Sequence, residues 1–92
     1  MNRFQIDGEI ILKNKIRYTP SGLIVQSFMI RHQSNQQEAN LKKTVGIELE
    51  AIFINKQERK EIQIGNKCLF IGFLEKKSLK SRQLIFHVTE FK

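Results

Sequence analysis

The residue types that perform catalysis are few in this sequence, and they stand apart from one another. Cys68, His32 and His87 are separated by long stretches, whereas a zinc site needs several cysteines and histidines at paired spacing. Glu48 and Glu50 resemble an acid pair, but two solvated carboxylates on the wet face of one strand are the simpler interpretation. No phosphate-binding or dinucleotide-binding glycine motif is present. We therefore expect a protein that is not an enzyme and has no metal and no cofactor.

Positive charge, by contrast, is concentrated. The chain has 16 Lys and Arg against 9 Asp and Glu, a net charge of +7, which favours an anionic partner, with nucleic acid ahead of a membrane. Closely spaced cations bind the phosphates of a nucleic acid and release its condensed counterions, which gives an affinity that does not depend on base sequence. Protection of a strand edge by lysines is the alternative interpretation. The densest group lies in residues 75–82 and consists of Lys76, Lys77, Lys80 and Arg82.

Further candidate binding residues lie in two other parts of the chain. Single strands are bound through cations and also through aromatic rings on which bases stack. Tyr18 is the candidate ring, although packing against the turn at Pro20 would explain it equally well. The phenylalanines fall mostly on apolar faces and are expected in the core, with Phe73 and Phe91 left open. The additional candidate cations are Lys13, Lys15, Arg17, Lys42 and Lys43.

These side chains must be positioned by elements whose apolar residues recur at every second position. Such alternation occupies residues 4–12, 45–53 and 84–88, whereas residues 23–32 and 67–74 are more continuously apolar. Alternation is typical of a strand with one buried face, and a continuous run is typical of a strand covered on both faces. The sequence therefore predicts five strands, without an internal repeat.

The segments around the expected strands carry bend and turn signals. Thr19-Pro20-Ser21-Gly22 is a turn in which proline fixes φ and glycine can take positive φ. Residues 33–40 are polar and have no periodicity, so we expect a mobile loop there. Residues 56–61 fit either one helical turn or a loop. Gly8 and Gly72 fall inside strands and mark sharp bends, which a small closed barrel requires.

Five short strands with such bends indicate an all-β chain that forms a single OB-fold barrel over residues 1–92. Any other small antiparallel barrel or sandwich, for example an SH3-like one, is the alternative. We expect residues 75–82 to form a long basic hairpin between the fourth and fifth strands. No signal peptide and no run long enough to cross a bilayer are present, so we expect a cytoplasmic protein without a membrane partner. A domain this small gains stability from self-association.

Two stretches of the sequence resemble a known family. The first is residues 16–22, followed by an apolar strand that ends in Arg31-His32-Gln33-Ser34, and the second is residues 71–78 after Gly65-Asn66. Both stretches resemble the primosomal replication protein N (PriB) family of OB-fold proteins. The resemblance extends over nearly the whole chain. The resemblance implies a homodimer that binds single-stranded DNA in the replication-restart primosome. It also implies that the protein bridges the PriA helicase and DnaT-like loader-side proteins, without catalysis.

Carried over to this sequence, the resemblance places the family's basic loop on the four cations of residues 75–82. It places the cation that precedes the turn on Arg17. Some members carry a cation where this chain has Gln33 and a tryptophan where it has Gly46, and both departures predict weaker binding. The chain ends at residues 91–92 without the acidic-tipped tail of ordinary single-stranded DNA-binding proteins, which favours the primosomal interpretation.

Two other functions fit the same residues. A protein-interaction adaptor would dock a helicase through the basic face and through the acidic pair Glu48 and Glu50, and its nucleic-acid binding would be weak and incidental. An RNA-binding OB-fold protein would use similar cations and add contacts to 2′-hydroxyl groups. The sequence leaves these alternatives open.

Overall fold

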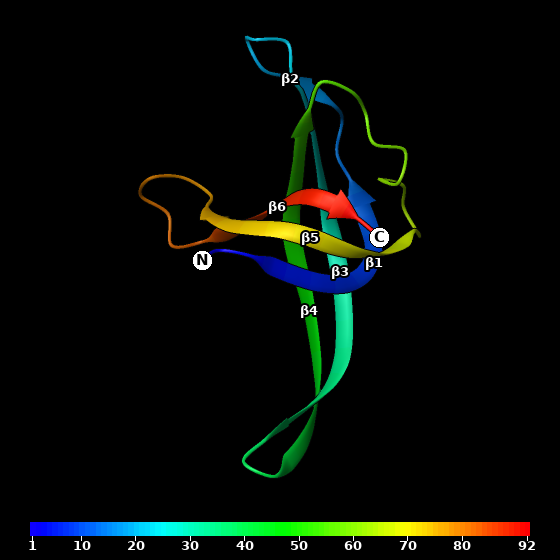
Figure 1. Cartoon of the computed structure of the whole chain (residues 1–92), viewed down its shortest axis with the longest axis vertical. Coiled ribbons are helices and arrows are strands. Elements are labelled where there is room, and N and C mark those ends of the chain that lie inside the picture. The colour runs from blue at the N-terminus through cyan, green and yellow to red at the C-terminus, as the bar shows by residue number, and fades with distance from the viewer.

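A computed structural model describes all 92 residues and contains strands but no helix long and apolar enough to span a bilayer. The strands are β1 (Phe4–Lys13), β2 (Arg17–Tyr18), β3 (Ile24–Glu38), β4 (Leu41–Asn55), β5 (Lys67–Lys76) and β6 (Leu84–Phe91). They form one sheet in the order β1-β5-β6-β4-β3-β2, which closes because β1 also pairs with β3 (Figure 1). Only the β4–β6 pairing is parallel. The predicted all-β, five-stranded OB-fold barrel is confirmed, with the short strand β2 added.

Closure of the barrel depends on two close approaches between strands. The first half of β1 pairs with β5 and the second half with β3, so β1 bends across the seam. A Cβ atom on Gly8 would lie 2.6 Å from the carbonyl oxygen of Arg31. A Cβ atom on Gly72, at the irregularity in the β5–β6 ladder, would overlap the carbonyl oxygen of His87. Only glycine lets the neighbouring backbones approach this closely.

The core fills the inside of the barrel. Ile62, from the connection between β4 and β5, is 1% exposed and plugs one end. Phe91 belongs to the core, and the Arg59 guanidinium lies 5.0 Å from the centre of its ring. Phe73 instead lies on the outside and is 37% exposed. The core residues are Ile10, Phe28, Ile30, Ala51, Phe53, Ile62, Phe70, Phe86, Val88 and Phe91.

Residues 33–40 are not a loop, so that prediction is wrong. Strand β3 continues to Glu38, and β4 begins at Leu41. The two residues between them, Ala39 and Asn40, both have positive φ, which is the backbone of a two-residue type I′ hairpin turn. The resulting arm projects far beyond the barrel (Figure 1). Both of its faces meet solvent there, so the strands need no alternation of apolar residues, and the periodic signal is absent.

The structure does not confirm a long basic hairpin between β5 and β6. Residues 77–83 form a connecting loop, and the Lys77 N–H donates to the Gln83 carbonyl at 2.9 Å to close it. The long hairpin of this protein is the β3–β4 arm. Residues 56–61 form a loop with bends and a turn rather than a helix.

Substitution of Gly72 tests the close approach of β5 and β6. We expect Gly72→Ala to lower the free energy of unfolding by about 1–3 kcal/mol, the usual cost of forcing atoms into a packed site. Gly46→Ala is the matched control, because its new Cβ would meet only Gln33 Cγ at 3.9 Å. Urea unfolding measures both variants. Equal stabilities of the two variants would show that the strands are not held together at Gly72.

Candidate nucleic-acid interface

A groove of about 650 Å³ crosses the outside of the barrel between β2 and the loop of residues 77–83. Arg17 lines it from β2, Ile52 lines it from β4, and Lys76 and Lys77 line it from the end of β5 and the loop. We call this hollow the basic groove. It brings together cations that lie about sixty positions apart in the sequence. Ligands of OB-folds bind on this type of surface, between the first and the last loop of the barrel.

Arg17 is positioned by the turn that follows it. Gly22 has a φ of 88°, which glycine adopts without strain. The Leu23 N–H donates to Thr19 Oγ1 at 3.0 Å, and the Thr19 N–H donates to the Leu23 carbonyl at 2.9 Å. The closed turn folds β2 back on β3, so that Arg17 pairs with Val25. The predicted turn thus positions the Arg17 side chain in the basic groove.

The loop cations are only partly neutralised by the protein's own carboxylates. Lys77 Nζ lies 2.8 Å from Glu50 Oε2. Lys76 Nζ donates to the Leu79 carbonyl at 3.4 Å and contacts no carboxylate. Lys80 and Arg82 are exposed and form no ion pair. Three of the four cations therefore remain available to an anionic ligand.

A pair of stacked aromatic rings, Phe73 and His87, lies beside these cations. His87 was not among the predicted binding residues. The rings of Phe73 and His87 stack at 4.7 Å between centroids with an interplanar angle of 9°. His87 Nε2 also pairs with Glu75 Oε2 at 2.9 Å. Phe73 and His87 are cross-strand partners on the outer face of β5 and β6. The sequence holds no signal for this contact, because Phe73 and His87 meet only when β5 pairs with β6.

The remaining predicted residues lie outside the basic groove. Tyr18 is 69% exposed but does not line the groove, because neighbouring strand residues point to opposite faces and Arg17 occupies the groove side. Lys13 and Lys15 line a second hollow, beside the connection between β4 and β5. Lys42 and Lys43 lie near the tip of the β3–β4 arm.

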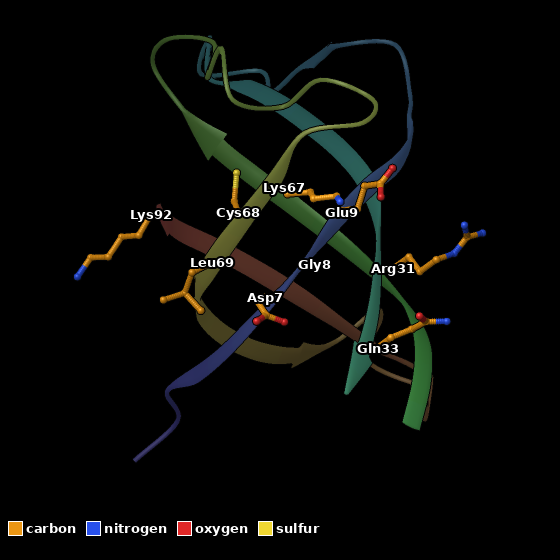
Figure 2. Close-up of a pocket in the computed structure, with 9 residues that line it drawn as sticks. All are labelled: Asp7, Gly8, Glu9, Arg31, Gln33, Lys67, Cys68, Leu69 and Lys92. Carbon is orange, nitrogen blue, oxygen red and sulfur yellow. The ribbon is translucent and has the colours of Figure 1, made fainter. Parts of the chain in front are cut away.

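A pocket of about 510 Å³ lies on another side of the barrel, where β1 runs between β3 and β5 (Figure 2). Charges of both signs line it, and Arg31 there already pairs with Glu48 at 3.1 Å. Cys68 packs against the core, and burial, followed by the nearby Glu61, raises the pKa of its thiol, while Arg59 opposes the shift. The thiol is therefore protonated at neutral pH, unlike that of a nucleophilic cysteine.

His32 lies in a chain of hydrogen bonds that resembles a catalytic triad. Its Nδ1 lies 2.7 Å from the Asp7 carbonyl and 3.0 Å from Asp7 Oδ1, and its Nε2 lies 2.8 Å from Ser34 Oγ. Gln36 Nε2 also donates to Ser34 Oγ at 3.0 Å. The side chain of Asp7 is 71% exposed, so water competes for its carboxylate. These hydrogen bonds link β1 to β3 at the point where the backbone pairing of the two strands ends.

Comparison with known proteins identifies the family. A protein-family sequence model described as "another single-strand binding protein family" matches residues 2–90. Replication restart protein PriB of Nitrosomonas europaea is 40% identical over 91 residues, which cover 97% of this chain and 84% of that protein. A solved structure of PriB from Ralstonia solanacearum shares the fold, with a TM-score of 0.84 at 24% identity, and the match covers 100% of this chain and 97% of that one.

A more distant structure shows how widely the architecture is shared. The Plasmodium falciparum SSB, solved in complex with single-stranded DNA, has a TM-score of 0.70 at 12% identity and covers 100% of this chain and 95% of that one. The likeness at this identity concerns the fold alone. From the family model and the Nitrosomonas relative, the chain belongs to the PriB replication restart proteins of this single-strand binding family.

Proposed function

We propose that this protein binds single-stranded DNA along the basic groove. The observation that carries the proposal is the meeting of Arg17 with the loop cations beside the Phe73–His87 stack. Phosphates would contact Arg17, Lys76, Lys80 and Arg82, and bases would rest on the exposed face of the stack. Cations next to aromatic rings are what binding of a single strand without base preference requires.

The role proposed for this binding is an accessory one in replication restart. The names of the relatives support it, since the Nitrosomonas europaea and Neisseria gonorrhoeae proteins are both called replication restart protein PriB. The proposal includes a homodimer that bridges the PriA helicase and DnaT-like loader-side proteins in the cytoplasm. DNA held on the outer face of the barrel would leave the β3–β4 arm free for such assembly.

Reversal of the unpaired loop cations tests the groove. Contacts to about four to six phosphates predict that log affinity falls with log salt at a slope near −3 to −4. We expect Lys76→Glu with Lys80→Glu to make that slope shallower by about 1.4, because two phosphate contacts are lost. Fluorescence anisotropy of labelled oligo-dT at several salt concentrations measures it. Lys67→Glu with Lys92→Glu, which places the same charge change at the pocket of Figure 2, is the control, and identical slopes in both variants contradict the proposal.

Substitution of Phe73 tests the stacking surface separately from charge. Base–aromatic stacking contributes about 1–3 kcal/mol per base, so we expect Phe73→Ala to weaken binding by that amount. The salt slope should stay unchanged, because no cation is removed. His87→Phe keeps a flat ring beside Phe73 and should retain affinity, whereas His87→Ala should lose it. Unaltered affinity of Phe73→Ala, in a protein shown by urea unfolding to be folded, would remove the stack from the site.

A protein-interaction adaptor is the second candidate, and one observation favours it. Glu50 already compensates Lys77 within the groove, which lowers the charge available to DNA. The acidic docking patch suggested by the sequence is itself occupied, because Glu48 pairs with Arg31 and Glu50 with Lys77. The basic face would then be the docking surface.

A pull-down with PriA helicase distinguishes the two candidates. If the bridging role depends on DNA, nuclease treatment of the lysate should reduce the yield of the complex. Lys76→Glu with Lys80→Glu should reduce the yield in untreated lysate to a similar extent. Undiminished yield after nuclease treatment would favour the adaptor over the DNA-binding accessory.

A further inference from the structure

A second hollow, of about 330 Å³, is lined in part by residues 13–16, which directly precede Arg17 of the basic groove. Lys13 and Lys15 line it from the end of β1, and Arg59 and Lys60 line it from the connection between β4 and β5. Glu58 is the only acidic residue in its lining. We call this hollow the second groove. Its charge is therefore predominantly positive, like that of the basic groove.

The second groove also contains the side-chain amide of Gln26. Gln26 is 6% exposed and lines the hollow. Its Oε1 accepts the backbone N–H of Arg59 at 2.8 Å, which fixes the orientation of the amide, because an N–H needs an acceptor. The Nε2 atom of Gln26 forms no hydrogen bond within the protein. The nitrogen is not enclosed by the protein, so it can donate to water or to a ligand in the hollow.

The side chains around the hollow are ordered to different degrees. Lys13 Nζ donates to Gln63 Oε1 at 3.1 Å, and Arg59 is held between Glu61, at 3.1 Å, and the ring of Phe91. Lys15 and Lys60 are exposed and form no ion pair. The groove therefore has a fixed floor and two free cations at its rim, an arrangement suited to phosphates of a flexible chain.

The linings of the two grooves come close together in the sequence at residues 15–17. Lys15 lines the second groove and Arg17 lines the basic groove, with only Ile16 between them. Two residues of extended chain span at most about 7 Å. A polyanion that leaves the basic groove at Arg17 would thus find the next cation, Lys15, two residues away in the chain.

We propose that the second groove is an extension site for the phosphate backbone of the single strand held in the basic groove, with Lys15 and Lys60 contacting phosphates and Gln26 Nε2 donating to an oxygen. This inference rests on the proposed function, because it continues the same strand. Short oligomers fill only the basic groove. Longer oligomers cross residues 14–16 and gain further phosphate contacts.

The test compares oligo-dT of about 6 and about 16 nucleotides, lengths within the range of OB-fold site sizes. We expect Lys15→Glu with Lys60→Glu to bind the short oligomer like the unchanged protein. With the long oligomer its salt slope should become shallower by about 1.4, which corresponds to two lost phosphate contacts. Lys60→Glu alone should change the slope by about 0.7. Native mass spectrometry verifies equal stoichiometry.

Three outcomes decide the question. If Lys15→Glu with Lys60→Glu gives the same slope as the Lys67→Glu, Lys92→Glu control on the long oligomer, the extension site does not exist. If it also loses the short oligomer, the two hollows are one site and the inference fails. If Lys76→Glu with Lys80→Glu leaves binding of the short oligomer intact, the basic groove is not the primary site. That last result overturns the proposed function and the inference together, whereas the first two overturn only the inference.

Discussion

Pairing of one strand with two partners is the interaction on which this structure depends. Strand β1 bonds to β5 in its first half and to β3 in its second, and at this seam Gly8 lets the backbones of β1 and β3 touch. Gly72 allows a similar close approach between β5 and β6. Closure buries one face of every barrel strand and leaves the other face outside. The outer faces of β4, β5 and β6 and the flanking loops are therefore free to carry a binding surface.

The balance between cations and the protein's own carboxylates defines that surface. Glu50 compensates Lys77, and Glu75 pairs with His87, whereas Lys80 and Arg82 remain free. The basic groove thus has a net positive charge, but some of its cations are neutralised by carboxylates. The Phe73–His87 stack is the aromatic pair beside these cations, in a chain that has no tryptophan. Contacts to phosphate supply affinity for any sequence, and stacking favours unpaired bases over a duplex.

Prediction from the sequence succeeded where burial leaves a periodic trace. The strands that line the core alternate or run continuously apolar, and the turn before Gly22 was recognised from its proline and glycine. It failed for residues 33–40, because a hairpin arm with solvent on both faces has no buried side to impose a period. It missed His87 as a binding residue, because a single histidine on a strand carries no mark of the ring it stacks against.

The chain alone determined the all-β fold, the turn that presents Arg17 and the basic character of residues 75–82, because local propensity and periodicity encode all three. Only the tertiary structure decided which cations meet. Arg17 joins Lys76 and Lys77 in one groove, Lys13 and Lys15 line another, and Lys42 and Lys43 lie on a distant arm. Charged side chains separated by tens of residues become neighbours only when backbone pairing closes the sheet. No local sequence pattern indicates which of them will lie close together in space.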